Sequence, residues 1–307
     1  MEPTRGILFR FCAVICFVVM FAMIKATSDS VPAGQAVFYR SAFALPMIIG
    51  WMVIRSELSI GLQVKSRSGH CWRSIFGTGA LSLNFAALGY LPLPEVTAIG
   101  YAAPLLTVVF AAFILGERLR IFRISAVVLG LLGVLVIVEP RLTVFNDVSA
   151  DKRAAIGSCL VLSAAVFNAF AQIQIRRLVQ NEHPAAIAFY FALTSTCLSL
   201  LTLPFGWVSL NSLQVFLLIA SGVMGGLGQI CLTLSYYYAP ASVVAPFEYA
   251  SIILALLIGY FIFSEVVSSQ MLIGVSIVIC TGVIIIWREA QLGIERSKAN
   301  ALKPSLH

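Results

Sequence analysis

Charged side chains are scarce in this sequence. Only 11% of its 307 residues are charged, whereas 60% are hydrophobic, and the mean hydropathy is +0.98. A soluble globular protein carries about 25% charged residues, so this chain has too few to cover a water-exposed surface. Apolar runs of about 18 or more residues recur along it, and runs of that length cross a bilayer as helices. The composition excludes a soluble protein and predicts an all-α membrane protein with many spans.

Motifs for nucleotide hydrolysis and for hydrolytic catalysis are also absent. The sequence has no G-x-x-x-x-G-K-[ST] loop, which excludes ATP hydrolysis by this chain, and neither H-E-x-x-H nor G-x-S-x-G occurs. His70 and His183 fall in gaps between apolar runs, and His307 falls in the tail. The seven cysteines form no C-x-x-C pair and mostly lie in apolar runs, which favours small buried side chains over metal ligands. We therefore expect no enzyme, no cofactor and no metal site.

The apolar runs divide the chain into ten predicted membrane spans. The first run follows Arg5 and Arg10 as in a signal peptide, but no small-residue cleavage site follows it, so we expect a retained first helix. Turn-forming or charged residues fill most of the gaps between runs. The predicted spans are 7–26, 34–54, 74–91, 94–115, 121–138, 154–174, 184–203, 213–236, 241–263 and 269–287.

Lys and Arg are distributed unevenly between the two sides that ten spans define. With the N-terminus in the cytoplasm, fifteen bases fall on the cytoplasmic side and three on the other, while Lys25 and Arg40 are left within or at the edge of the membrane. The positive-inside rule requires such a bias, and merging 74–115 into one kinked helix would scramble it. The bases therefore indicate ten spans with both termini in the cytoplasm, and the net charge of +7 does not indicate nucleic-acid binding. The fifteen are Arg5, Arg10, Arg55, Lys65, Arg67, Arg73, Arg118, Arg120, Arg123, Arg176, Arg177, Arg288, Arg296, Lys298 and Lys303; the three are Arg141, Lys152 and Arg153.

The sequence repeats itself at an offset of 148 residues. Residues 90–117 read YLPLPEVTAIGYAAPLLTVVFAAFILGE and align without a gap on residues 238–265, which read YAPASVVAPFEYASIILALLIGYFIFSE. Shared apolar composition does not explain the matched Tyr, Pro and Glu positions. A repeat of five spans must enter the membrane from the opposite side in its second copy, and bases follow the first copy but not the second. The spacing therefore predicts two inverted five-helix repeats, an arrangement found in secondary transporters. Identical pairs are Tyr90/Tyr238, Pro92/Pro240, Val96/Val244, Tyr101/Tyr249, Ala102/Ala250, Leu106/Leu254, Phe113/Phe261, Ile114/Ile262 and Glu117/Glu265.

Ten spans in two such repeats, with fourth helices ending in Gly116-Glu117 and Ser264-Glu265, resemble the EamA family of the drug/metabolite transporter superfamily. The resemblance implies a central cavity between the halves that opens alternately to each side and carries small organic solutes. The Ala-Ala-Pro at 102–104 is similar to the family pattern, whereas the second copy has Ala-Ser-Ile at 250–252. The division we expect is a first repeat at 1–140, a connecting loop at 141–153, a second repeat at 154–289 and a basic cytoplasmic tail at 290–307.

Glu248 is the first candidate for a functional side chain. It lies about seven residues inside the predicted ninth span, where a carboxylate costs several kcal/mol unless it is paired, protonated or hydrated. Its repeat equivalent is Gly100, so the fold does not require an acid there. Two interpretations of Glu248 remain open: it lines the cavity, or it is protonated and hydrogen-bonds a neighbouring helix. Pro104 and Pro246 are hinge candidates because each frees a backbone carbonyl, although each could equally kink its helix without contacting a ligand.

Two bases and a second acid also fall near the predicted membrane boundaries. Lys25 and Arg40 lie near the outer ends of the first two spans, so extension of their side chains to lipid headgroups is the default. Arg40, behind Tyr39, is the better candidate for pairing with a substrate anion or with Glu248. Glu95 begins the fourth span, where a helix N-terminus favours a carboxylate.

Neutral polar and aromatic residues complete the candidate site. Amides in the third, sixth and eighth spans either line the cavity or form interhelical hydrogen bonds. Tyrosines in the fourth and ninth spans either stack on a planar ligand or belong to an interfacial belt. The small-residue pair Gly222 and Gly226 indicates close helix packing. The candidates are Asn84, Asn168, Gln172, Gln229, Tyr101 and Tyr249.

These features predict a secondary transporter in a bacterial inner membrane, with a small-molecule substrate and the lipid bilayer as partners. The expected mechanism is alternating access by rocking of 7–140 against 154–287, driven by a proton on Glu248 or by the solute gradient alone. Riboflavin uptake is the first substrate hypothesis, and export of amino acids or drug-like metabolites is the alternative. A channel or an intramembrane enzyme is the rival from another class, and a homodimer is left open.

Overall fold

The structure is a computed structural model that describes residues 3–115, 121–142, 152–178, 181–239 and 241–284. Within these ranges the chain folds into helices and short connections, with no strand. Gly116 and Glu117, the bases Arg118 and Arg120, most of the 141–153 loop and the tail at 290–307 lie outside the described residues.

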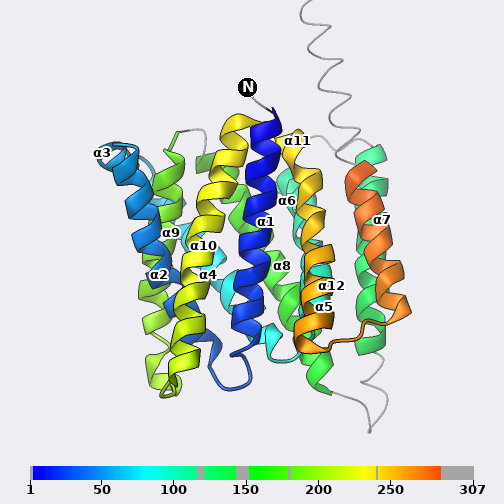
Figure 1. Cartoon of the computed structure of the whole chain (residues 1–307). Coiled ribbons are helices and arrows are strands. Elements are labelled where there is room, and N and C mark those ends of the chain that lie inside the picture. Colours follow the sequence, from blue (N-terminus) through cyan, green and yellow to red (C-terminus); the bar gives the residue numbers. More distant parts are fainter. Residues whose placement is uncertain (1–2, 116–120, 143–151, 179–180, 240, 285–307) are drawn as a thin grey trace, which may run out of the picture.

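The ten predicted spans are all present as helices (Figure 1). The predicted fourth span consists of α5 and α6, and the predicted ninth consists of α11, the 3-10 helix η3 and α12. Two short elements, α3 and η2, lie in the connections. The elements are α1 (Pro3–Lys25), α2 (Ala33–Ile54), α3 (Leu58–Gly61), α4 (Arg67–Leu88), α5 (Leu93–Gly100), α6 (Ala102–Leu115), α7 (Ile121–Leu142), α8 (Lys152–Leu178), α9 (Pro184–Leu200), η2 (Leu203–Phe205), α10 (Ser212–Tyr238), α11 (Ala241–Val244), η3 (Ala245–Tyr249), α12 (Ala250–Phe263) and a C-terminal helix (Ser269–Ile284).

Among the described residues, five of the ten spans contain helices long and apolar enough to cross a membrane, and four more contain shorter apolar helices. The tenth, α4, begins seven residues before its predicted start at 74, and its first turns carry Arg67, His70 and Arg73. Ser66 starts the helix early because its side-chain oxygen accepts a hydrogen bond from the backbone N–H of Gly69 at 3.3 Å. A polar first section therefore extends α4 beyond its apolar run.

The two repeats are inverted, as the sequence predicts. We call the end of the bundle that holds Arg55, Arg67 and Arg177 the basic end; the start of α1 lies there too (Figure 1). The other end, formed by residues 26–32, 201–211 and 264–268, is called the opposite end. The chain leaves α6 at the basic end and leaves α12 at the opposite end. Equivalent connections of the two repeats thus lie on opposite sides of the bundle.

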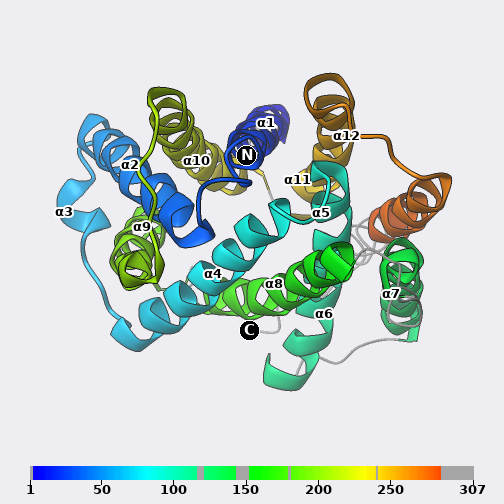
Figure 2. The same cartoon turned by 90° about the horizontal axis from the view of Figure 1, so that it is seen from below.

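Packing between the helices does not follow the division into sequence halves. The first helix of the first repeat, α1, lies along α10 of the second, and the first helix of the second repeat, α8, lies along α4 of the first (Figure 2). The two contacts are related by the pseudo-two-fold symmetry of inverted repeats. Phe85, Leu88, Leu93 and Ile99 are among the fully buried side chains of the shared core. Each half therefore contributes its first helix to the other.

Candidate functional site

Both fourth helices of the repeats are interrupted at equivalent positions. Tyr101 separates α5 from α6, and η3, which ends at Tyr249, separates α11 from α12. Pro104 is the third residue of α6, where its missing N–H leaves no helical hydrogen bond unmade. Pro246 lies at the start of η3. Interrupted helices at membrane depth are tolerated where protein or a water-filled cavity satisfies the freed backbone groups.

The two interruptions meet at Tyr101 and Tyr249. Their ring centroids are 5.0 Å apart, with an angle of 32° between the ring planes. The Tyr101 hydroxyl donates a hydrogen bond to the backbone carbonyl of Glu248 at 3.0 Å and lies 2.5 Å from the hydroxyl of Ser251. Tyr101 is buried and Tyr249 half-buried. The structure therefore brings three predicted site residues, Tyr101, Tyr249 and Glu248, into one cluster.

Glu248 forms an ion pair with Arg10 of α1. The Arg10 Nη2 atom donates to Glu248 Oε2 at 2.5 Å, and the side chains are 4% and 53% exposed. Arg10 was predicted only as one of the cytoplasmic bases, and its role as a partner of Glu248 was not predicted. A signal was available, because Phe9 and Phe11 flank Arg10 inside the first apolar run.

Arg40 does not pair with Glu248, contrary to one of its two predicted roles. It lies on α2, which packs against α10 and α9, whereas η3 packs against α1. The guanidinium carbon of Arg40 lies 5.6 Å from the centroid of the Phe191 ring on α9, and that of Arg73 on α4 lies 3.9 Å from the same centroid. Both arginines are buried. Arg73 is a second residue that the sequence analysis placed with the cytoplasmic bases.

Lys25 does not extend to the membrane surface, contrary to the default expectation. Its Nζ atom donates to the backbone carbonyls of Leu88 at 2.7 Å and Leu91 at 2.8 Å, and lies 3.5 Å from Oε1 of Glu265. Glu265 Oε2 accepts the backbone N–H of Leu93 at 2.9 Å, so an acid of the second repeat caps α5 of the first. Burial raises the pKa of Glu265, although the Leu93 N–H and Lys25 act in the other direction. Lys25 thus joins the end of α1 to two other elements at the opposite end.

The predicted amides are less closely grouped. The side chain of Asn84 donates to the carbonyl of Ala80 in its own helix at 2.9 Å. Asn168 and Gln229 are half-buried, and Gln172 is exposed. None of these four side chains belongs to the tyrosine cluster. Glu95 is buried in the first turn of α5, where the dipole of that helix favours a carboxylate, as predicted.

Gly222 and Gly226 pack α10 against α2, which confirms the role predicted for them. A Cβ atom at Gly222 would lie 2.5 Å from the Cβ of Phe43, and one at Gly226 would lie 2.8 Å from the Cβ of Met47. Side chains larger than hydrogen would separate the two helices.

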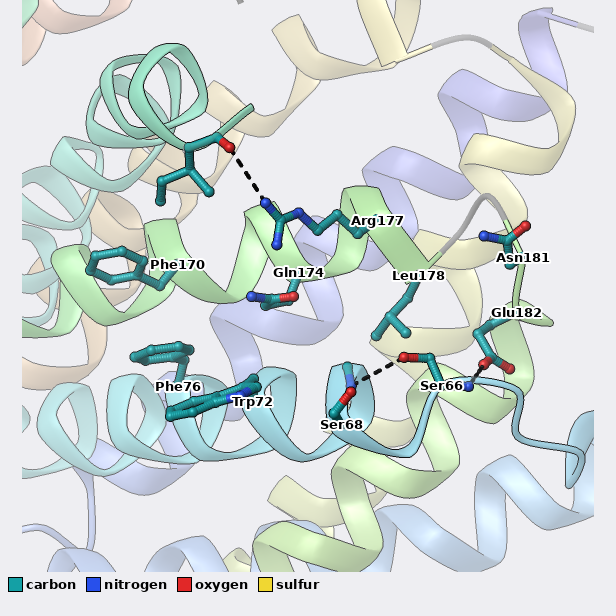
Figure 3. Close-up of a pocket in the computed structure, with 12 residues that line it drawn as sticks. Ser66, Ser68, Trp72, Phe76, Phe170, Gln174, Arg177, Leu178, Asn181 and Glu182 are labelled. Carbon is teal, nitrogen blue, oxygen red and sulfur yellow. Dashed lines mark hydrogen bonds between the residues drawn. The ribbon is translucent and has the colours of Figure 1, made fainter. Parts of the chain in front are cut away.

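A cavity of about 600 Å³ lies at the basic end, between the start of α4 and the end of α8 (Figure 3). Aromatic rings form part of its wall: Phe76 stacks on Trp72 at 5.6 Å and on Phe170 at 5.1 Å between centroids. Gln174 and Arg177 of α8 also line it. Aromatic rings that line a cavity can stack on a planar ligand.

Glu182 closes one side of this cavity by binding the chain before α4. Its Oε1 atom accepts the backbone N–H groups of Lys65 at 2.8 Å and Ser66 at 2.6 Å, and Oε2 lies 3.7 Å from His70 Nε2. Burial acts to raise the pKa of Glu182, but the hydrogen bonds from Ser66 and Lys65 and the neighbouring His70 lower it below its usual value. The carboxylate therefore fixes the connection between α3 and α4 in its ionised form.

The model of the EamA-like transporter family matches this chain twice, over residues 4–139 and 155–288. The chain belongs to the EamA-like transporter family. Over 273 residues it is 30% identical to the pseudopaline exporter CntI of Pseudomonas aeruginosa, covering 88% of this chain and 91% of that protein. It is 26% identical over 284 residues to a riboflavin transporter of Vibrio cholerae, covering 91% of each. It is 24% identical over 255 residues to an S-adenosylmethionine uptake transporter of Rickettsia prowazekii, covering 83% of each.

A solved crystal structure shares the fold of this EamA-like transporter. The two align with a TM-score of 0.67 over 95% of this chain and 99% of the other, at 19% sequence identity. The family and these relatives show that the chain is a multi-pass membrane transporter with a small-molecule substrate, and their names indicate transport rather than catalysis. The three relatives act on three different solutes and include both an exporter and an uptake system.

Proposed function

We propose that this EamA-like transporter is a secondary active carrier that moves a small organic solute across a bacterial inner membrane by alternating access. The contact between Tyr101 and Tyr249 carries the proposal. Transporters built from inverted repeats bind their solutes near the midplane, between interrupted helices of the two repeats. Here the equivalent interruptions lie in contact, with an ion pair beside them.

The moving bodies in this proposal differ from the two sequence halves. Arg10 binds α1 to η3 near the basic end, and Lys25 binds the other end of α1 close to Glu265, just after α12. Packing along α10 adds to these two contacts. Rocking of 7–140 against 154–287 would break all three, so we propose that α1 moves with α10 and α12.

The ion pair between Arg10 and Glu248 is the proposed gate at the basic end. Glu248 is half exposed, so water reaches a carboxylate whose partner is buried. A proton taken up by Glu248 would remove its charge from the pair and release α1 from η3. This step would couple the gate to the proton gradient. The proposed orientation places the basic end and both termini in the cytoplasm, as the positive-inside rule requires.

Riboflavin uptake remains the first substrate hypothesis. The stacked rings of Trp72, Phe76 and Phe170 beside the basic-end cavity support a planar solute, and one relative is a riboflavin transporter. Export is the second hypothesis, supported by the relative at 30% identity, which is an exporter.

Flux measurements in proteoliposomes test the proposal. We expect uptake of labelled riboflavin to saturate with concentration, and Glu248→Gln to lower the initial rate at least about tenfold by removing the carboxylate that pairs with buried Arg10. Glu57→Gln is the matched control, because Glu57 also pairs with an arginine at 3.0 Å, but that arginine, Arg55, is exposed, whereas Arg10 is buried. Flux that rises linearly with concentration would indicate a channel. Full activity of Glu248→Gln would remove this pair from the mechanism.

A further inference from the structure

Two buried arginines, Arg40 and Arg73, stand without a counter-charge among the described residues. Arg40 is 4% exposed and Arg73 is 6% exposed. The Nε atoms of both, and Nη1 of Arg73, have no hydrogen-bond partner, and no described carboxylate lies within ion-pair distance of either guanidinium. Both contact the ring of Phe191. The two positive charges therefore share one site.

Such an arrangement is unfavourable unless something else compensates for it. A buried charge without a partner costs several kcal/mol, and a second charge of the same sign adds repulsion. A cation–π contact with one ring returns only about 1 to 2 kcal/mol. Elsewhere among the described residues, buried Arg10 binds Glu248 and half-buried Lys25 binds two carbonyls. Because no described residue is such a partner for Arg40 and Arg73, the counter-charge that fits this site is a negative group on a bound molecule.

The site lies in the middle of the bundle. Phe191 is the eighth of the seventeen residues of α9, so both guanidinium groups reach about half the depth of that helix. Two glycines make room for them: a Cβ at Gly225, on the facing helix α10, would lie 3.0 Å from Arg40 Nε, and a Cβ at Gly77, one turn after Arg73 on α4, would collide with Arg73 Nη1. Groups this deep in a membrane are functional candidates by default.

We propose that Arg40 and Arg73 together bind an oxyanion group, a carboxylate or a phosphate, on the transported solute. This inference rests on the proposed carrier function. A guanidinium group presents parallel N–H donors that fit the two oxygens of a carboxylate or phosphate. The hydroxyls of Ser41 and Ser74, which follow the two arginines in sequence, are also buried and have no hydrogen-bond partner among the described residues. The substrate class is therefore an organic anion, which favours the export hypothesis over riboflavin, because riboflavin carries neither a carboxylate nor a phosphate.

Thermal unfolding of the full-length protein in nanodiscs tests the inference without a transport assay. Sodium succinate and inorganic phosphate are the probes, and sodium chloride at equal ionic strength is the reference. We expect at least one probe to raise the Tm saturably, and the better probe identifies the favoured oxyanion. Arg40→Gln and Arg73→Gln should each weaken its apparent Kd at least about tenfold, while Arg55→Gln at the exposed surface should not. Arg40→Lys and Arg73→Lys should each weaken the apparent Kd less than the glutamine variants do, because lysine keeps the positive charge.

The unliganded variants provide a second readout. Removing one of two repelling charges should leave the Tm of Arg40→Gln and Arg73→Gln equal to or above that of the wild type. A lower Tm together with an unchanged response to the probes would overturn the inference and assign the arginines a structural role. So would a wild-type protein that responds no more to either probe than to chloride. If riboflavin flux saturates but neither probe binds, the carrier proposal stands and this inference fails. If a probe binds but no solute gradient drives flux, the anion site at Arg40 and Arg73 stands and the carrier proposal fails.

Discussion

Tyr101 and Tyr249 lie 148 positions apart in the chain and contact each other with ring centroids 5.0 Å apart. They are equivalent residues of the two repeats, so their contact marks the pseudo-two-fold axis between them. The hydroxyl groups of the two tyrosines, however, differ in their hydrogen bonds. That of Tyr101 bonds to Glu248 and Ser251, whereas no described group accepts a hydrogen bond from Tyr249. Two repeats of the same origin thus contribute unequally to the site.

This inequality predicts different effects for two matched substitutions. Tyr101→Phe removes the hydrogen bonds to Glu248 and Ser251, each worth about 1 kcal/mol net, and should lower transport about tenfold while preserving the ring contact. Tyr249→Phe removes no described hydrogen bond and should leave transport within about twofold of the wild type. Initial rates in proteoliposomes, at matched protein content, measure both. Equal losses in the two variants would contradict the asymmetry of the site.

The ion pair between Arg10 and Glu248 should show strong coupling in a double-mutant cycle. Glu248→Gln leaves Arg10 buried without its charged partner, and breaking a fully buried pair costs about 3 to 5 kcal/mol. Because Glu248 is 53% exposed, we expect a smaller loss, about 1 to 2 kcal/mol. Adding Arg10→Gln should recover part of that loss. The free energy of unfolding in mild detergent measures each corner of the cycle, and additive effects of the two single variants would show that the pair contributes no coupling.

The fold follows from the sequence because a bilayer leaves so few alternatives. Chains in lipid must satisfy their backbone groups within helices, so apolar runs and basic loops determined the spans and their directions. The inversion followed from an odd number of spans in each repeat. The sequence did not predict that α1 packs on α10 and that α8 packs on α4. An apolar helix face does not specify which other apolar face it contacts.

The candidate site was predicted only in part, for a related reason. Glu248, Tyr101 and Tyr249 stood out because they are polar residues in or beside a repeated proline segment. Arg10 and Arg73 were not recognised as site candidates because they lie within three turns of a helix end, where a base usually reaches the headgroups. Whether such a base turns outward or inward depends on the neighbouring helix. Here Glu248 and Phe191 face inward-pointing arginines.

Packing of α10 on α2 predicts opposite effects for two Gly→Ala changes. A Cβ at Gly226 would lie 2.8 Å from the Cβ of Met47 and 3.2 Å from backbone atoms of Ala44, so Gly226→Ala should destabilise the protein by about 1 to 3 kcal/mol. Gly50, on α2, has no atom within 4 Å of such a Cβ. Gly50→Ala should therefore raise stability slightly, because alanine favours the helix by up to about 1 kcal/mol. Thermal unfolding compares them, and a stabilising Gly226→Ala would refute the close packing.

Glu182 and Glu265 should change the pH dependence of stability in opposite directions. The pKa of Glu182 lies below its unfolded value of 4.5 in the folded protein, so its contribution is complete above pH 4.5 and disappears as the pH falls through the folded value. Glu182→Gln should flatten the acid decline of the Tm. Burial raises the pKa of Glu265, so the folded protein binds a proton there more readily than the unfolded chain does. The stability of the folded state should therefore rise as the pH falls toward 4.5, and Glu265→Gln should remove that rise. Tm measurements between pH 7 and pH 3 separate the two, and parallel curves for both variants would contradict the assignment.

Space beside Gly100, the repeat equivalent of Glu248, offers a direct test of the solute path. A Cβ at Gly100 would have no atom within 4 Å, although the residue ends α5 next to buried Tyr101. If this space belongs to the path, Gly100→Ala should transport normally, whereas the indole ring of Gly100→Trp should block flux at least about tenfold without lowering the Tm. The unchanged Tm matters because it separates obstruction from misfolding, since overpacking a filled site would cost about 1 to 3 kcal/mol. Normal flux through Gly100→Trp would place the path elsewhere.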